Sequence, residues 1–239
     1  MKNMFLCFPK PKSISDLESN KAVYDRTRKP SDLRRSIQIA VVDDQPFAPE
    51  TNLRNNQFQI SVLKDVNNVD ELRDYQIILC DLQGVGLQLS SDMQGAFLIE
   101  EVKRNFPEKS VIAFTGGSAN SNISKRAYQA ADDYLKKDAS IDEWRDVLDR
   151  HIKNLSSPVN VWRQFRLRLV EAGITPYELM LLEDAYVKCI KDNPRETKSA
   201  IQKIVDNGSN AHVKSEVMAF VGSKAFDFLI AALTNYASS

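Results

Sequence analysis

Short runs of apolar and β-branched residues alternate with helix-like segments between residues 37 and 155. The runs IQIAVV and IILC are almost continuously apolar, as expected for strands covered on both faces of a parallel sheet. The connections between runs are long enough for the crossover helices that parallel strands require. The pattern therefore predicts a doubly wound α/β fold with a five-stranded parallel sheet. The predicted strands are residues 37–42, 58–63, 75–80, 111–114 and 133–135.

Apolar residues at helical spacing predict helices in the connections between these strands. Residues 69–75 and 95–105 are two such segments. Ser140 and Glu143 form a capping box in front of an apolar stripe that ends at Leu155, which predicts a helix after the fifth strand. The helix after the first strand is expected to be short at most, because its segment PFAPETNLRNN contains two prolines and three asparagines.

Residues 156–239 show no strand pattern, and the sequence SSP marks a linker in front of them. Thr175 and Glu178 form a capping box around a proline, and Asn193 and Glu196 repeat the arrangement, so each predicts the start of a helix. The segment is expected to be a small all-α module of four or five helices. Its apolar stripes include Trp162, Phe165 and Leu169; Leu179, Leu182, Tyr186 and Cys189; Ala200, Ile201 and Ile204; and Phe226, Leu229, Ile230 and Leu233.

Charge and composition predict a basic N-terminal tail and a cytoplasmic location. Residues 1–36 carry nine basic and four acidic side chains with little periodicity, which predicts a basic, mobile tail. The whole chain has a formal net charge of zero, so it has no charge excess to drive tight binding to nucleic acid or anionic lipid. Three widely spaced cysteines and the lack of a run long enough to span a membrane favour a soluble protein of the reducing cytoplasm.

Polar residues stand where the predicted strands end. Asp43 and Asp44 follow the first strand, Asp81 the third and Thr115 the fourth, and Lys137 follows the fifth. Ligands of open parallel sheets bind at this edge. Three carboxylates gathered there repel one another and require a cation, and oxygen ligands of this kind suit Mg²⁺. With the metal bound, one carboxylate can attack phosphorus, while a hydroxyl and an ammonium bind the phosphoryl oxygens.

The fragments VVDDQPF, IILCDLQGVG, VIAFTGG and DDYLKKD, in this order, resemble the response-regulator receiver domains of two-component signalling. The resemblance covers about half of the chain and implies the flavodoxin-like receiver fold for residues 37–155. It also implies an Mg²⁺ cofactor and a histidine kinase or phosphotransfer protein as the phosphoryl donor. The implied roles are phosphoacceptor for Asp81, metal pocket for Asp43 and Asp44, metal-binding backbone carbonyl for Gln83, switch hydroxyl for Thr115, phosphate-binding ammonium for Lys137 and switch ring for Tyr134.

Several positions depart from the family pattern. Asp138 stands where the family has proline, and Gly116 stands where it has alanine. Lys137 is favoured over Lys136 because the family places its lysine three residues after the aromatic residue of the fifth strand. The loop after Asp81 is longer than usual by residues 84–92, which leaves open whether this insertion shields the site, sets the lifetime of the phosphate or contacts a partner.

The resemblance implies a phosphorylated signalling regulator that catalyses only its own phosphorylation and dephosphorylation. Residues 156–239 would pass on its state by binding a downstream protein or by self-association. The plainer alternative is a receiver-like fold that no longer switches by phosphorylation, but packing alone hardly explains the retention of all five chemical groups, since buried carboxylates without a cation or phosphate are costly.

Two further alternatives concern the helical module. Arg163, Arg166 and Arg168 would contact phosphates if the module bound DNA, although a solvated basic face is the plainer interpretation. His212, in AHVKSEVMAFVG, loosely resembles the histidine of phosphotransfer domains, which suggests a degenerate phosphotransfer module. His151 is expected to be structural or at the surface.

Overall fold

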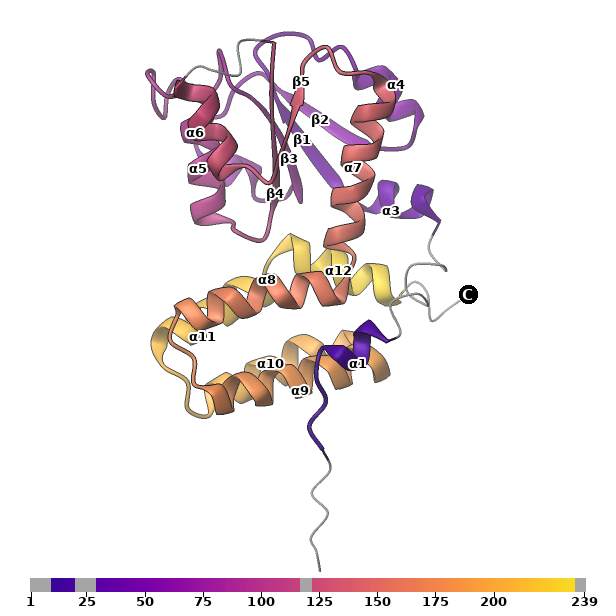
Figure 1. Ribbon diagram of the computed structural model, residues 1–239, viewed down its shortest axis with the longest axis vertical. Helices are drawn as coiled ribbons and strands as arrows, with labels where there is room; N and C mark the ends of the chain where they lie inside the picture. Colours follow the sequence, from indigo (N-terminus) through magenta and orange to yellow (C-terminus); the bar gives the residue numbers. More distant parts are fainter. Residues whose placement is uncertain (1–9, 20–28, 117–121, 235–239) are drawn as a thin grey trace, which may run out of the picture.

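Five parallel strands form one sheet in the order β2-β1-β3-β4-β5. The computed structural model describes residues 10–19, 29–116 and 122–234. The strand order places β1 and β3 in the middle of the sheet, where the order of the chain reverses (Figure 1). The strands are β1 (Gln38–Val42), β2 (Gln59–Leu63), β3 (Ile77–Asp81), β4 (Ser110–Thr115) and β5 (Asp133–Lys136).

Helices cover both faces of the sheet, as the sequence pattern predicted (Figure 1). Because side chains alternate along a strand, Ile39 and Val41 of β1 enter one apolar core and Ala40 and Val42 enter the other. All four are fully buried, which explains the continuous apolar run. The first core lies under α4 (Glu50–Asn55) and α7 (Ile141–Leu155), and the second under α5 (Gln94–Asn105) and α6 (Asn122–Ala130).

The segment 69–75, predicted as a helix, forms only the short 3₁₀ turn η1 (Val69–Leu72). Asn68 and Glu71 cap this turn reciprocally. The chain cannot continue as a helix because Gln76 already bonds to β1 just before β3 begins. Its backbone N–H donates to the Gln38 carbonyl at 3.0 Å, and its side-chain oxygen accepts a hydrogen bond from the Gln38 backbone at 2.7 Å. Helix α4 has six residues, in agreement with its weak sequence signal.

Residues 156–234 form a helical module with a core of its own. Trp162 stacks on Tyr186 with ring centroids 4.7 Å apart, and Phe165 stacks on Phe220 at 3.8 Å. The capping box at Thr175 is present, whereas the chain after Asn193 starts with the 3₁₀ turn η2 (Pro194–Glu196) before it becomes α-helical. The helices are α8 (Pro158–Glu171), α9 (Pro176–Asp192), α10 (Thr197–Asp206), α11 (Ala211–Val221) and α12 (Lys224–Thr234).

Two parts of the predicted mobile tail are packed against the rest of the protein, which corrects the prediction for them. Helix α1 (Ser15–Glu18) places Leu17, fully buried, in the core of the helical module. Helix α3 (Pro30–Ser36) lies on the sheet domain, where Arg34 pairs with Asp149 of α7 at 2.8 Å. Side-chain burial and a bidentate ion pair thus fix segments that composition alone assigned to a tail. Residues 1–9 and 20–28 of this tail lie outside the described residues.

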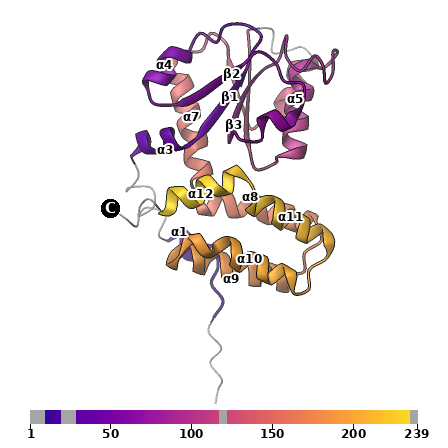
Figure 2. The ribbon, with the colours of Figure 1, turned by 180° about the vertical axis from the view of Figure 1, so that it is seen from behind.

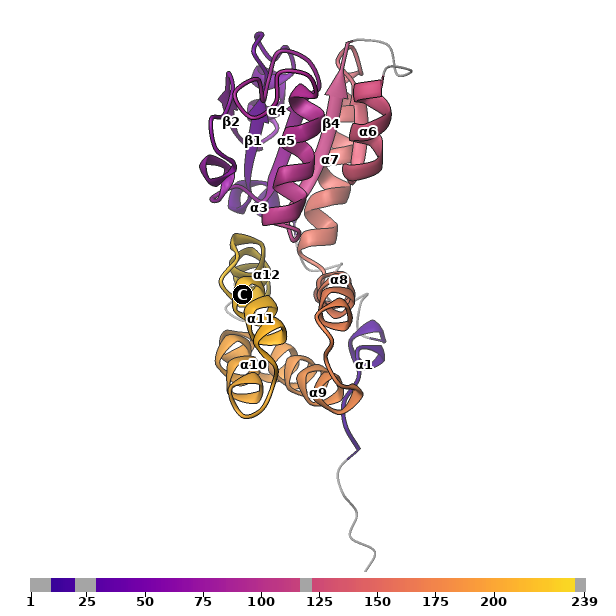
Figure 3. The same cartoon turned by 90° about the vertical axis from the view of Figure 1, so that its left-hand side faces the viewer.

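The helical module packs against the edge of the sheet where the strands begin (Figure 2). Ala225 and Phe228 of α12 enter the same core as the α7 face of the sheet. The backbone carbonyl of Lys224 accepts a hydrogen bond from Gln76, and Arg168 of α8 lies 3.7 Å from Glu108 of the sheet domain. Helices α8 and α12 form the layer next to the sheet domain, and α9 and α10 lie farther away (Figure 3). The edge where the strands end stays clear of the module (Figure 1).

His151 of α7 joins two strands through buried polar contacts. Its Nδ1 lies 2.5 Å from the hydroxyl of Ser110 at the start of β4, and its Nε2 lies 3.1 Å from Asp133 at the start of β5. His151 and Ser110 are both buried, so each satisfies the polar group of the other. The expectation of a structural histidine agrees with this position.

Among the described residues, no single helix combines the length and apolar composition needed to cross a membrane. Helices α11 and α12, bent by 54° at their junction, satisfy both requirements only when they are taken together.

Candidate functional site

Three carboxylates gather at the edge of the sheet where the strands end. Asp43 and Asp44 follow β1, and Asp81 is the last residue of β3, the strand next to β1. One oxygen from each side chain lies within 4.8 Å of those of the other two. Asp43 and Asp81 are buried, whereas Asp44 is exposed. The sequence prediction that these acids lie together agrees with the structure.

The backbone of the β1–α4 loop fixes the two adjacent acids in different orientations. The Asp43 backbone nitrogen still bonds to β2, through the Leu63 carbonyl at 3.0 Å, so this residue continues the ladder into the sheet. Gln45 donates its backbone N–H to Asp43 Oδ1 and its side-chain amide to Asp44 Oδ2, both at 2.9 Å. Gln45 escaped the sequence analysis, although its position directly after two aspartates is typical of a turn in which a carboxylate accepts a backbone N–H.

Lys137 brings a positive charge between two of these acids. Its Nζ donates to Asp81 Oδ2 at 2.8 Å and to Asp43 Oδ1 at 2.9 Å. Its backbone N–H bonds to the Thr115 carbonyl, which extends the pairing of β5 with β4. The structure brings Lys137 rather than the exposed Lys136 to the carboxylates.

Burial and charge shift the ionisation of this group. Burial raises the pKa of Asp81 above its ordinary value, and the Asp43 carboxylate adds to the effect against the opposing bonds from Lys137. Burial alone would lower the pKa of Lys137, but its bonds with Asp81 and Asp43 leave it raised. Lys137 is therefore held as a cation beside Asp81, and its positive charge stabilises the ionised form of that buried carboxyl group.

The donor set fits a hard divalent cation. Asp43 Oδ2 is buried and has no hydrogen-bond partner among the described residues, which is costly for a carboxylate oxygen unless a cation is bound there. Three carboxylates in one place match the oxygen ligands of Mg²⁺. Gln83, whose carbonyl the sequence resemblance assigns to the metal, is the second residue after β3, and its backbone nitrogen lies 3.4 Å from Asp81 Oδ1.

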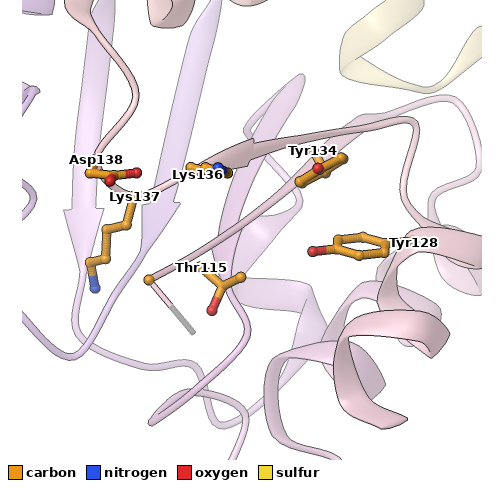
Figure 4. A pocket seen from close by; sticks show the side chains of 7 residues that line it. Thr115, Tyr128, Tyr134, Lys136, Lys137 and Asp138 are labelled. Carbon is orange, nitrogen blue, oxygen red and sulfur yellow. The ribbon is translucent and has the colours of Figure 1, made fainter. Parts of the chain in front are cut away.

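Thr115 and Tyr134 line one pocket of about 570 Å³ beside the acids. Thr115 ends β4 and is buried. Tyr134 of β5 is 46% exposed, and its ring centroid lies 4.5 Å from that of Tyr128 on α6. Both rings border the pocket, and Lys137 points away from them (Figure 4). The pocket thus leaves space between the threonine and the tyrosine.

The strand order β2-β1-β3-β4-β5, with helices on both faces, is the flavodoxin-like arrangement in which ligands bind between the ends of β1 and β3. The acids lie at this switch point. The sheet domain has the receiver fold.

Solved receiver structures resemble about half of the chain. A response regulator from Thermotoga maritima is 17% identical over 48% of this chain and 97% of its own, with a TM-score of 0.40. The receiver domain of a sensor histidine kinase from Pseudomonas aeruginosa PAO1 is 23% identical over 48% and 97%, with a TM-score of 0.42, and holds a magnesium ion in its active-site cleft. At such identities the likeness concerns the fold alone. No protein-family profile and no curated protein matches the sequence.

The arginines of α8 that suggested DNA binding are paired with carboxylates. Arg163 bonds to Glu18 of the N-terminal segment, and Arg166 lies 3.8 Å from Glu183. Arg168 pairs with Glu216 at 2.5 Å and with Glu108 of the receiver domain at 3.7 Å. Each of these arginines thus has a carboxylate partner, which reduces the positive charge available for contacts with phosphates.

His212 lies exposed in the first turn of α11, and Asn210 caps this helix. This position is the one expected for an ordinary histidine at the start of a helix. Phosphotransfer by His212 stays a prediction without support from the geometry.

Proposed function

We propose that this protein is a response regulator whose Asp81 accepts a phosphoryl group from the phosphohistidine of a histidine kinase or phosphotransfer protein. The observation that carries the proposal is the placement of Lys137 between Asp81 and Asp43, next to a buried Asp43 oxygen that lacks a hydrogen-bond partner among the described residues. A purely structural ion pair has no need of three converging carboxylates. Phosphoryl transfer needs a nucleophilic carboxylate, further carboxylates that bind a metal ion, and an ammonium that binds the phosphoryl oxygens.

In the proposed reaction, an Asp81 oxygen attacks phosphorus in line with the P–N bond of the donor. The new P–O bond forms as the P–N bond breaks, and the leaving imidazole takes up a proton. Lys137 is already bonded to Asp81 Oδ2, so its ammonium would move only slightly to bind a phosphoryl oxygen. Backbone N–H groups of Leu82 and Gln83 donate to Asp81 Oδ1 at 2.7 and 3.4 Å and orient the carboxylate.

Asp43, Asp44 and Asp81 would hold Mg²⁺, with the Gln83 carbonyl as a further ligand. When bound, the ion supplies positive charge that lowers the repulsion between the carboxylates and an incoming phosphoryl group. Asp43 is fully buried and Asp81 almost so, which keeps bulk water away from two of the three ligands. The site thus excludes solvent on the side of the sheet and opens on the side of Asp44.

Thr115 and Tyr134 would report phosphorylation. The Thr115 hydroxyl would bind a phosphoryl oxygen, and Tyr134 would turn from its exposed position into the pocket that it shares with Thr115. The pocket would admit the ring, and its present contact with Tyr128 would then be lost. This change would alter the β5–α6 surface.

The helical module would transmit the state to a downstream protein or to a second copy, in the cytoplasm. The three arginines of α8 are engaged in ion pairs, which favours a protein target over DNA. In this proposal, the chain catalyses no reaction other than its own phosphorylation and dephosphorylation.

Beryllofluoride, which mimics a phosphoryl group on a carboxylate, provides the test. Calorimetric titration in the presence of Mg²⁺ should show binding to the wild-type protein and none to Asp81→Asn. Asp92→Asn, the same change at an exposed acid of the following loop, should bind as the wild type does. Equal binding by Asp81→Asn and the wild type would rule the proposal out.

A further inference from the structure

The insertion formed by residues 84–92 is a folded part of the receiver domain. Val85 is fully buried in the core under α5 and α6, and Leu89 packs against the same core. The Gly86 carbonyl accepts hydrogen bonds from the backbone of Leu89 and Ser90, at 3.1 and 2.9 Å. The loop therefore has a defined backbone rather than that of an open surface excursion.

Two side chains outside the insertion hold its backbone. Gln94, the first residue of α5, accepts the Gly84 N–H on its Oε1 at 2.9 Å. Asp65, in the loop after β2, accepts the Gly86 N–H at 2.6 Å. Gln94 has a φ of +49°, a left-handed conformation that residues with a side chain adopt at a cost. Gln94 thus adopts an unfavourable backbone conformation in which its side chain binds the Gly84 N–H.

Gly84 lies directly against the exposed acid of the metal pocket. A β-carbon at this position would fall 2.6 Å from Asp44 Cγ and Oδ2, and the φ of Gly84 is +79°. Only glycine allows such an approach in this conformation. Asp44 is the one acid of the three that burial does not fix, so the Gly84 backbone and Gln45 are its immediate constraints.

The turn at Gln94 and Gly95 also contacts Asp81, the proposed phosphoacceptor. A β-carbon on Gly95, the residue after Gln94, would lie 2.0 Å from the Asp81 carbonyl oxygen. The turn at Gln94 and Gly95 is thus pressed against the Asp81 backbone on one side and bonded to the loop beside Asp44 on the other. One short segment connects two of the three metal-binding acids.

We propose that the insertion is the positioning element of the metal pocket, and that Gln94 sets Mg²⁺ affinity by holding Gly84 against the Asp44 carboxylate. This inference rests on the proposed function, since it concerns the metal of that site. Asp65 contributes by accepting the hydrogen bond from the Gly86 N–H, which holds the other end of this stretch of the loop. Gln94 and Asp65 act through the loop and need not touch the metal, so they are positioning residues.

Calorimetric titration of the full-length protein with Mg²⁺ alone tests the proposal. Gln94→Ala removes the acceptor of one partly buried backbone N–H and should weaken Mg²⁺ binding by roughly threefold to tenfold, the value of one net hydrogen bond. Gln88→Ala, the same substitution at an exposed position of the insertion, is the matched control and should leave the affinity unchanged. Gly84→Ala should weaken binding further, and thermal unfolding of each variant reports whether the fold is kept.

A double-mutant cycle separates positioning of Asp44 from a general loss of structure. If Gln94 acts through Asp44, Gln94→Ala should have little further effect on Mg²⁺ affinity in an Asp44→Asn background. Unchanged Mg²⁺ affinity in Gln94→Ala, or full additivity in the cycle, overturns the inference and leaves the proposed function standing. A wild-type protein that binds neither Mg²⁺ nor beryllofluoride overturns both.

Discussion

The ammonium of Lys137 lies 2.8 Å from Asp81 Oδ2, and the same nitrogen reaches Asp43. A charge-assisted bond of this kind contributes about 1.5–3 kcal/mol. Lys137→Met should therefore weaken beryllofluoride binding in Mg²⁺ by about tenfold or more, measured by calorimetry. Lys136→Met, the neighbouring and exposed lysine, is the matched control and should bind almost as the wild type does. Similar losses in both variants would show that general positive charge matters and that the specific contact does not.

The raised pKa of Asp81 predicts how stability depends on pH. Burial raises this pKa, so the folded protein keeps the proton at pH values where the unfolded chain, with a pKa of about 3.9, has lost it. Stability contributed by this residue thus falls as pH rises through that interval. In a metal chelator, Asp81→Asn should have a higher free energy of unfolding than the wild type at pH 7, with the difference shrinking below about pH 4. Urea unfolding at both pH values measures this, and a difference independent of pH contradicts it.

The sheet and its site were predictable because their signals are local. A buried parallel strand is a continuous apolar run, and the residue that ends it is visible in the sequence, so Asp43 and Asp81 could be placed at one edge. The Asp44 contact was not predictable in this way. It depends on the backbone conformation of Gly84 and on a side chain ten residues further along the chain, and no periodicity encodes either.

The N-terminal segment shows a second limit of sequence patterns. Between residues 13 and 20 only Ile14 and Leu17 are apolar, and two residues are too few for a periodic signal. The helical module nevertheless buries Leu17 completely, and Ile14 packs against the same core. In α12, Leu229 faces the module while Phe228 faces the receiver domain. An apolar stripe shows that a helix is buried, but it does not identify the domain that covers each side.

Replacing Leu17 tests the docking of the N-terminal segment. Leu17→Ala should lower the free energy of unfolding by about 2 kcal/mol, because it removes a fully buried side chain from the core of the helical module. Leu167→Ala, at a leucine that is 66% exposed on α8, should change it by less than about 0.5 kcal/mol. Urea unfolding measures both values. A mobile tail would make the two variants indistinguishable.

Replacing Phe228 tests the contact between the module and the receiver domain. This ring is 3% exposed and belongs to the core beneath α7, so Phe228→Ala should lower the free energy of unfolding by about 3 kcal/mol. Tyr177→Ala, at an aromatic residue of the module that is 67% exposed, serves as the control. Hydrogen exchange of α7 should quicken only in Phe228→Ala. Unaltered exchange in α7 would show that α12 does not support the receiver domain.

The most direct test of the central claim locates the phosphoryl group itself. The protein is incubated with acetyl phosphate and Mg²⁺, the acyl phosphate is trapped by borohydride reduction, and the modified residue is identified by peptide mass spectrometry. The proposed function predicts modification at Asp81, its loss in Asp81→Asn and its loss when Mg²⁺ is chelated. Trapping at another acid in the wild-type protein, or none at all, would contradict the assignment of Asp81 as the phosphoacceptor.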